Sequence, residues 1–395
     1  MDKDPNVRRV GEARLRPGSG ITLSSVRVGE LRQSRYSPPV RRVDLLCSSS
    51  GEHLSQLMSG FAMLAASGII DVRLHRAPDY SPGVGGTVLR AEIDGHRVVY
   101  DTRDASDFPT DDLAWATAFF KRSFEPGAVN ASGRAEIIRP LGLNYSVYAP
   151  GDWRFRRMAW SLAGLRRSNA RDVVTRIGRL SSIGSRFTNT GRASALARLY
   201  EEDPSRPGRS IFFLVRTWDP RRVQGQQAEE RAHMNRTRTE SIRLLRQEFG
   251  PRFVGGLSAS PDALRDYPDI IADPRLVKKP AYLEAKRSAA VCIASRGLVD
   301  SNGWSLAECV AASRAIVTEP LAHQVPGEFS AGRNYLEFSN PDALLEAVHS
   351  LLDDDDKRAA MRTANHRYYT KNLRPDAIVA RTLEQLDSPG RLEHG

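Results

Sequence analysis

Short, continuous apolar runs alternate with helical segments along most of this chain. The first run is VDLLC (residues 43–47), followed by a helical stretch that ends at Gly68 and by a second run, IDVRLHRA. Apolar runs of about four to eight residues are typical of strands in parallel sheets, where helices cover both faces. The alternation predicts an α/β fold that begins with a Rossmann-like sheet.

The rest of the first half contains a predicted β-hairpin. Strand signals flank Asp94-Gly95, a dipeptide that favours tight hairpin turns. We expect a helix over residues 113–124 and a strand over residues 135–142 to complete this domain.

The same alternation resumes near Ser210. The expected elements are, in order, the strand RSIFFLVRTW, a helix over 235–249, the strand RFVGGLS, a helix over 281–288, the strand AAVCIAS, the helix SLAECVAAS, the strand AIVTE, a short NYLEF, the helix PDALLEAVHSLL and a final helix near 375–386. A second α/β domain is therefore predicted.

The length of 395 residues also favours two domains, since one core rarely exceeds about 200 residues. The predicted division is a flexible N-terminal arm (1–40), an N-terminal Rossmann-like domain (41–205) with an Arg-rich connector (151–205), a C-terminal Rossmann-like domain (206–375), and a C-terminal helix and tail (376–395).

Composition excludes several classes of protein. No apolar run approaches the ~20 residues that span a bilayer, and the N-terminus lacks the apolar stretch of a secretory signal. Cys47, Cys292 and Cys309 have no C-x-x-C spacing, which argues against a disulfide framework or a zinc site. A cytoplasmic protein is expected.

The net charge of +11 is concentrated in one segment. Residues 151–200 contain 11 Arg against only Asp152 and Asp172. Aromatic and apolar residues are interleaved with these arginines: Trp153, Phe155, Trp160 and Leu165. This mixture suits an anionic membrane surface or a phosphorylated acceptor, and a solvated surface explains it equally well. Nucleic acid ranks lowest because no nucleic-acid-binding motif accompanies the charge.

Common nucleotide-binding motifs are missing from the sequence. There is no G-x-x-x-x-G-K-[ST], and GVGG (residues 83–86) lacks the strand-to-helix setting of a dinucleotide loop. P-loop kinases and nicotinamide dehydrogenases are therefore poor interpretations.

Residues 281–338 contain the most informative pattern. Asp300 and Glu308 are separated by seven residues at the start of a predicted helix, IFFLVRTWDP with Arg216 lies upstream, and GRNYLEFSNPDALLEAVHSLLDD follows. This order resembles the donor domain of GT-B glycosyltransferases, the group-1-like bacterial families that build surface polysaccharide. The resemblance covers about residues 210–386 and extends to the N-terminal half only in outline. Asp300 stands where those families carry Glu.

The resemblance implies two Rossmann-like domains that face each other across a cleft, an acceptor-side N-terminal domain (41–205) and a nucleotide-sugar-binding C-terminal domain (206–375). It also implies a role for each of the matched residues. Glu308 would bind the ribose and Asp300 would face the sugar. The diphosphate would accept hydrogen bonds from the backbone amides of a helix start, at Gly303, Trp304 and Ser305. Its charge would be neutralised by Arg216 and by Lys279 or Lys286. Because side-chain cations replace a metal in this class, neither a metal nor a cofactor is expected beyond the donor substrate.

Each of these residues also has a purely structural interpretation. Ser305 and Glu308 have the spacing of a capping box, which alone would explain Glu308. Asp300 suits a turn, Trp304 suits packing, and Arg216 could pair with Asp219. Lys279 and Lys286 could be solvated.

The first domain offers a candidate for the acceptor side. His53 follows the first predicted strand, next to Glu52, and an imidazole titrates near neutral pH. A helix cap or a surface position explains His53 equally simply. Asp101 and Asp104 are rival candidates.

The predicted function is metal-independent transfer of a hexose from a nucleotide-diphosphate sugar to a glycan or lipid-linked acceptor, at the inner membrane face. Families with the acidic pair usually retain anomeric configuration, although Asp300 leaves this open. The alternatives are a nucleotide-sugar epimerase of the same fold and a non-catalytic, basic binding protein. A phosphorylase would need a pyridoxal lysine, which no segment resembles.

Overall fold

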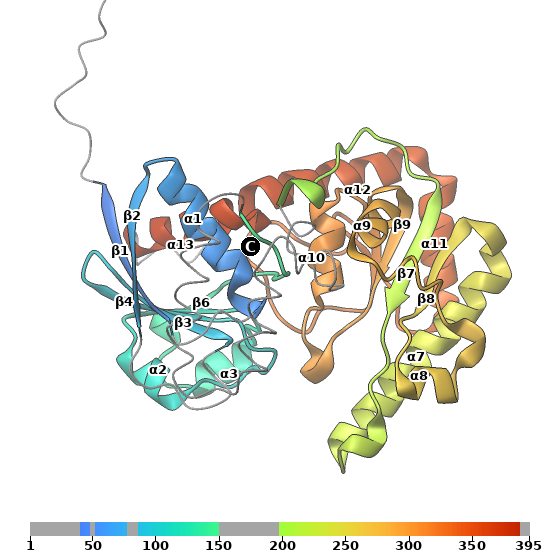
Figure 1. The fold of residues 1–395 in the computed structure, drawn as a ribbon, viewed down its shortest axis with the longest axis horizontal. Helices are drawn as coiled ribbons and strands as arrows, with labels where there is room; N and C mark the ends of the chain where they lie inside the picture. Colours follow the sequence, from blue (N-terminus) through green and yellow to red (C-terminus); the bar gives the residue numbers. More distant parts are fainter. Residues whose placement is uncertain (1–39, 48–51, 77–85, 150–196, 388–395) are drawn as a thin grey trace, which may run out of the picture. The chain divides into compact units, whose positions relative to one another are not determined.

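The computed structural model describes residues 40–47, 52–76, 86–149 and 197–387 (Figure 1). All of them belong to one compact unit, Val40–Gly395. Most of the expected N-terminal arm and of the Arg-rich segment 151–200 lies outside the described residues. Within the described ranges, no helix has the length and apolar character that a membrane span requires.

The first sheet has six strands in the order β2-β1-β3-β4-β5-β6. The β3–β4 hairpin is antiparallel and β3 also pairs antiparallel with β1, whereas the other neighbours are parallel. Asp94 and Gly95 both have positive φ, 49° and 85°, as the predicted tight turn requires. The strands are β1 (Arg41–Cys47), β2 (Ile70–Arg76), β3 (Val88–Ile93), β4 (His96–Asp101), β5 (Ala118–Lys121) and β6 (Ile138–Pro140).

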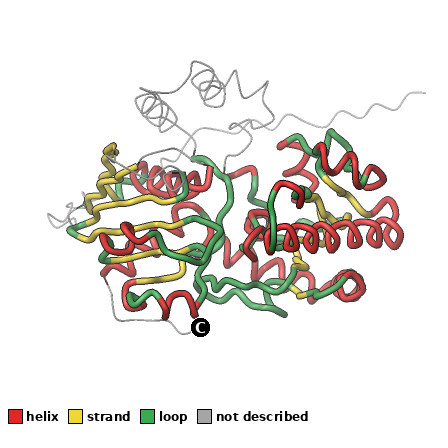
Figure 2. Tube along the Cα trace, turned by 90° about the horizontal axis from the view of Figure 1, so that it is seen from below, coloured by secondary structure: helices red, strands yellow, loops and turns green. Residues whose placement is uncertain are grey.

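The second sheet is parallel throughout, in the order β11-β10-β9-β7-β8. Its strands are β7 (Ser210–Val215), β8 (Phe253–Leu257), β9 (Ala289–Ala294), β10 (Ala315–Thr318) and β11 (Leu336–Glu337). Its helices are α7 (Gln226–Phe249), α8 (Pro261–Asp266), α9 (Lys279–Arg287), α10 (Trp304–Ala311), α11 (Pro341–Asp353) and α12 (Asp355–Tyr368). Both α/β sheets that the sequence predicts are thus confirmed, with helices beside the strands (Figure 2).

The helix predicted over residues 113–124 is wrong. That stretch contains the end of α2 (Thr110–Trp115) and then β5, which lies between β4 and β6. Phe119 and Phe120 are both fully buried but belong to the cores on opposite faces of the sheet. A central strand buries both faces, so its continuous apolar run has no alternation that would distinguish it from a helix.

The C-terminal helix packs into the core of the first sheet. The helix α13 (Pro375–Asp387) contributes Ile378 and Val379 to the cluster that contains the apolar face of α1 (Ser55–Ala66), and the two helices lie side by side in Figure 1. Gly60 permits this approach, because a Cβ there would lie 1.9 Å from the carbonyl oxygen of Pro375. The chain therefore returns to its first sheet after completing the second.

Polar residues follow the carboxyl ends of the second sheet's strands. Arg216 follows β7, Ser295 and Arg296 follow β9, and Glu319 follows β10. Ligands of open α/β sheets bind at this edge, so these residues mark where the chemistry of the second sheet is expected.

Candidate functional site

Glu308 is the centre of a buried, charged cluster. It lies on α10 and is only 5% exposed. Lys279 donates a hydrogen bond of 2.9 Å to Oε1, and Lys286 donates one of 2.7 Å to Oε2. The Tyr282 hydroxyl donates a further bond to Oε2. Both lysines and Tyr282 come from α9, so the packing of α9 against α10 builds the cluster.

The cluster keeps Glu308 ionised. Burial opposes ionisation, but the charges of Lys279 and Lys286, together with the hydrogen bonds from Lys286 and Tyr282, outweigh it and lower the Glu308 pKa to about 2. Burial and the negative charge of Glu308 raise the pKa of Tyr282, which therefore remains a hydrogen-bond donor.

The two lysines differ in accessibility. Lys286 is 1% exposed and also donates to the Tyr282 hydroxyl and, at 3.2 Å, to Ser305 Oγ. The Lys279 side chain is 23% exposed, and its ammonium lies over the rings of Tyr200 and Tyr282 at 4.8 and 5.0 Å. One lysine suffices to neutralise Glu308. The second leaves a surplus positive charge at an accessible position.

The start of α10 is open, and its cap differs from the predicted one. Gly303 is the N-cap, no side chain caps the helix, and Ser305 is the second helical residue. The predicted capping box of Ser305 and Glu308 is therefore wrong, because it would need Ser305 to precede the helix. A Cβ on Gly303 would approach the Ser295 carbonyl oxygen to 2.8 Å, which explains the glycine. An uncapped helix start favours a negatively charged ligand.

Arg216 is exposed and stacks on an aromatic ring at the end of β7. Its guanidinium lies 3.9 Å from the centroid of the Trp218 ring. No carboxylate among the described residues lies within ion-pair distance of Arg216, since Asp219 pairs with Arg221 instead. Asn235 hydrogen-bonds both the amide and the carbonyl of Trp218 and so fixes this loop. The cation is held in place but its charge is not neutralised.

Arg238 connects the ends of two strands and was not identified from the sequence. It is 5% exposed and donates to the carbonyl oxygens of Arg216 and Arg296, both at 2.7 Å, and to Ser295 Oγ at 3.0 Å. Burial lowers its pKa to about 10. The residue thus fixes the loops after β7 and β9 relative to each other.

Asp300 lies in the loop before α10, outside the Glu308 cluster. Its side chain is 63% exposed and accepts a 2.8 Å hydrogen bond from Arg296. The Arg296 amide in turn donates to Glu319 at 2.9 Å. The two members of the acidic pair are therefore in different environments, one buried and one accessible.

His53 contacts the aromatic ring at the start of α10. The rings of His53 and Trp304 lie 4.9 Å apart in an edge-on arrangement. Burial and the nearby charge of Arg122 lower the pKa of His53, so the imidazole is neutral at neutral pH. Its Nδ1 is buried without a hydrogen-bond partner among the described residues. A neutral imidazole is the protonation state that a general base requires.

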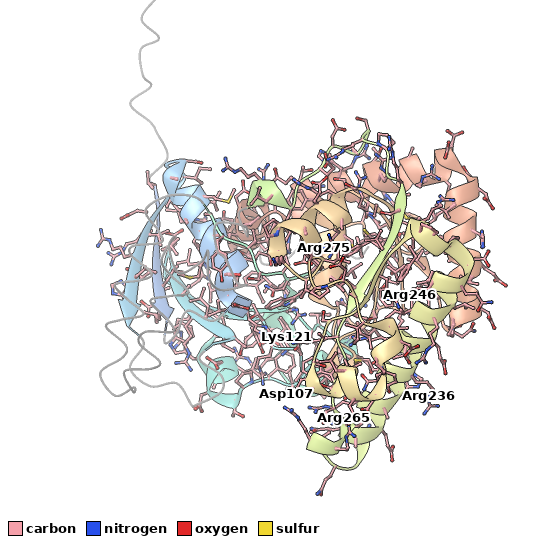
Figure 3. The ribbon with its side chains drawn as sticks, turned by 45° about the vertical axis from the view of Figure 1, so that its right-hand side comes forward. Asp107, Lys121, Arg236, Arg246, Arg265 and Arg275 are labelled. Atoms are coloured by element: carbon pink, nitrogen blue, oxygen red, sulfur yellow. The ribbon has the colours of Figure 1, made fainter. Side chains whose placement is uncertain are left out.

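Arg122 and Lys121, at the end of β5, bind the candidate aspartates of the first sheet. Arg122 is 3% exposed and pairs with Asp104, and it also donates to the Asn302 carbonyl oxygen at 2.8 Å. Lys121 is fully buried and donates to Asp101 at 2.7 Å and to the Asp107 carbonyl oxygen at 2.8 Å (Figure 3). Both aspartates are thus engaged by cations, which favours His53 over them as a free base.

A separate hollow lies beside α2 and α3 (Pro126–Ala131), with a volume of about 610 Å³. It is mainly apolar and is lined by Asp107, Phe108, Thr110, Leu113, Ala114, Ala128, Ala131, Ser132 and Arg134. Its two charged residues, Asp107 and Arg134, are ion-paired with Arg103 and Glu136, so the Glu308 cluster remains the better candidate for polar chemistry.

No group of three or more His, Cys, Asp or Glu that could hold a metal occurs among the described residues. Cys292 and Cys309 are buried free thiols. The groups that the site does offer are cations, an ionised carboxylate and an open helix start. Such groups suit a ligand that carries both negative charge and hydroxyls.

Comparisons with known proteins give a weak structural likeness. No family model and no curated protein matches the chain. An α1,3-fucosyltransferase aligns over 90% of this chain and 92% of its own, at 11% identity and a TM-score of 0.37. HepE from Anabaena, solved with UDP and glucose, aligns over 86% of this chain and 96% of its own, at 12% identity and a TM-score of 0.33.

The C-terminal domain of LpcC, a group 1 family glycosyl transferase from Francisella tularensis, aligns over 44% of this chain and 95% of its own, at 12% identity and a TM-score of 0.32. LpcC and the fucosyltransferase are named as glycosyltransferases. A likeness at this level supports no conclusion about the activity or the substrate, which are argued below from the residues.

Proposed function

We propose that this chain is a glycosyltransferase that moves a sugar from a nucleotide-diphosphate sugar to a glycan or lipid-linked acceptor. The observation that carries the proposal is the pairing of the buried Glu308 carboxylate with two lysines beside the open start of α10. The carboxylate can accept hydrogen bonds from the hydroxyls of a nucleotide sugar, and the surplus cation can bind its diphosphate.

The donor would bind by exchanging partners at Glu308. Ribose hydroxyls would donate to Oε1, which Lys279 occupies in the free protein, while Lys286 and Tyr282 continue to hold Oε2. The released Lys279 ammonium, together with Arg216, would then neutralise the diphosphate. The amides of Trp304 and Ser305 would complete the diphosphate site.

The acceptor would be activated by His53. As the neutral imidazole, it would take the proton of the acceptor hydroxyl while that oxygen bonds to the anomeric carbon from the face that the diphosphate leaves, so that the C–O bond to the diphosphate breaks and the configuration is retained. Trp304, in edge contact with His53, would form the wall between donor and acceptor. Asp300, which is exposed beside the start of α10, would face the sugar.

The leaving diphosphate would be stabilised by Lys279 and Arg216 without a metal. Transfer of a hexose with retention, polysaccharide synthesis as the biological role, and a cytoplasmic location with peripheral contact at the inner membrane face remain parts of this proposal. An anionic membrane surface would bind the Arg-rich residues 151–200, of which 151–196 lie outside the described residues.

The test is an assay for released nucleoside diphosphate in the presence of EDTA. A panel of sugar nucleotides would be supplied with and without a mixture of glycan and lipid-linked acceptors. Release that depends on both substrates supports the proposal. Conversion of the donor to an isomer without an acceptor would indicate an epimerase, and binding without turnover would indicate a non-catalytic protein.

A further inference from the structure

The loop before α10 contains two consecutive residues in the left-handed region of backbone conformation. Val299 has φ 57° and Asp300 has φ 52°. This region is unfavourable for a β-branched residue such as valine, so the loop is strained at this position. The strain therefore has to be compensated by contacts elsewhere in the loop.

Side-chain packing does not explain the conformation of Val299. Val299 is 52% exposed, so its side chain does not pack into a hydrophobic core. The backbone of Val299, in contrast to its side chain, makes a defined contact. Glu230 on α7 accepts a hydrogen bond of 2.5 Å from the Val299 amide, across 69 residues of sequence.

Local contacts close the same loop. The Gly297 amide donates to the Ser301 carbonyl oxygen at 2.7 Å, and Arg296 pairs with Asp300. These contacts link residues of the loop to each other, whereas the bond to Glu230 attaches the Val299 amide to the long helix α7. Glu230 is half-buried and its neighbour Glu229 is exposed.

We propose that Glu230 is a positioning residue that holds Val299 and Asp300 in the conformation that recognises the transferred sugar. The proposal rests on the function proposed above and extends it to a residue that does not contact the ligand. Because Asp300 directly follows Val299, fixing the Val299 amide sets the direction in which the Asp300 carboxylate leaves the loop. Binding of the nucleotide depends instead on Glu308, which lies within α10 and not in this loop.

The proposal separates recognition of the sugar from recognition of the nucleotide. Loss of the Glu230 carboxylate should relax the loop and weaken binding of a sugar nucleotide, but leave the nucleoside diphosphate nearly unaffected. Glycine adopts positive φ without strain, so in Val299→Gly the loop should keep its conformation with less help from the Glu230 hydrogen bond.

The experiment compares Glu230→Ala, Val299→Gly, the double variant and the matched control Glu229→Ala. Titration calorimetry would measure Kd for UDP and UDP-glucose, and for the corresponding pairs with ADP, GDP and dTDP. We expect Glu230→Ala to weaken binding of the sugar nucleotide about 10-fold, with nucleoside diphosphate binding changed less than about twofold. The double variant should recover most of the loss, and Glu229→Ala should resemble the wild type.

Equal weakening of both ligands in Glu230→Ala, or no recovery in the double variant, would overturn the proposal while leaving the proposed function intact. Absence of binding of every nucleoside diphosphate to the folded wild-type protein would instead reject the proposed function, and the role of Glu230 with it.

Discussion

The ammonium of Lys279 lies 2.9 Å from Oε1 of Glu308 and is its only hydrogen-bond partner among the described residues. Oε2, by contrast, is held by Lys286 and Tyr282. The carboxylate therefore has one permanently bound oxygen and one oxygen whose partner is partly exposed. This difference gives the site a means of exchanging an internal cation for a ligand hydroxyl.

Replacing Lys279 should weaken diphosphate binding selectively. In Lys279→Met the surplus cation is lost, while Glu308 keeps Lys286 as its ion-pair partner. We expect the Kd of the nucleoside diphosphate to rise about 10-fold and that of the matching nucleoside to change little, as calorimetry can measure. The control is Lys278→Met, at an exposed neighbouring lysine. An equal rise in Kd for the nucleoside and for the nucleoside diphosphate would contradict the role assigned to Lys279.

Glu308 should make stability depend on pH in the acid range. Its folded-state pKa of about 2 lies below the usual 4.5, so its ion pairs stabilise the fold above pH 4.5. That contribution is lost as the pH falls towards about 2. Glu308→Gln should lower the free energy of unfolding by about 3 kcal/mol at pH 7, because two lysines lose their partner.

Urea unfolding at pH 7 and at pH 3 would measure this effect. The difference between wild type and Glu308→Gln should shrink at the lower pH. Glu284→Gln removes a half-exposed carboxylate from the same helix as the two lysines, and should cost less than about 1 kcal/mol. A pH-independent difference for Glu308→Gln would show that its ion pairs contribute little.

His53 should be needed for transfer but not for donor binding. Its pKa is lowered from 6.5, so it remains an effective base down to a lower pH than a free imidazole. The rate should therefore decline only below about pH 6.5 as the ring protonates. His53→Asn should reduce the transfer rate by about 10²–10⁴-fold and leave the Kd of the nucleoside diphosphate unchanged. The exposed His233, replaced by Asn, serves as the control.

Gly60 should be essential for docking of the C-terminal helix. A Cβ there would lie 1.9 Å from the Pro375 carbonyl oxygen and 2.6 Å from Val379. Gly60→Ala should therefore displace α13 and lower stability by about 1–3 kcal/mol, despite the higher helix propensity of alanine. Thermal unfolding would measure it. Ser67→Ala, beyond the exposed end of α1, should change stability by less than about 0.5 kcal/mol.

Much of the fold could be predicted from apolar patterns, but not where those patterns are ambiguous. The Asp94-Gly95 hairpin and the strands of the second sheet follow from local signals. The strand that contains Phe119 and Phe120 could not be predicted in this way, because β5 is buried on both faces. The return of α13 to the first sheet depends on long-range packing, which has no local pattern.

The site was predictable where its residues are close in sequence. The pattern from Asp300 to Glu308 identified the start of α10. The supporting residues Arg238, Arg122 and Glu230 contact that region across 58, 180 and 69 residues respectively, so no local spacing could indicate them. Tyr282 also had no sequence signal, since its role depends on α9 packing against α10.

The most direct test of the central claim measures ligand-induced stabilisation in the wild type and in Glu308→Gln. Thermal unfolding would be followed with UDP, ADP, GDP, dTDP and their sugar conjugates, in EDTA, with Glu284→Gln as the control. Ligands that bind the native state raise its stability by mass action. We expect one nucleotide to raise the melting temperature of the wild type and of Glu284→Gln, and to have little effect on folded Glu308→Gln. An equal rise in all three proteins, or no rise in any of them, would contradict a nucleotide site at Glu308.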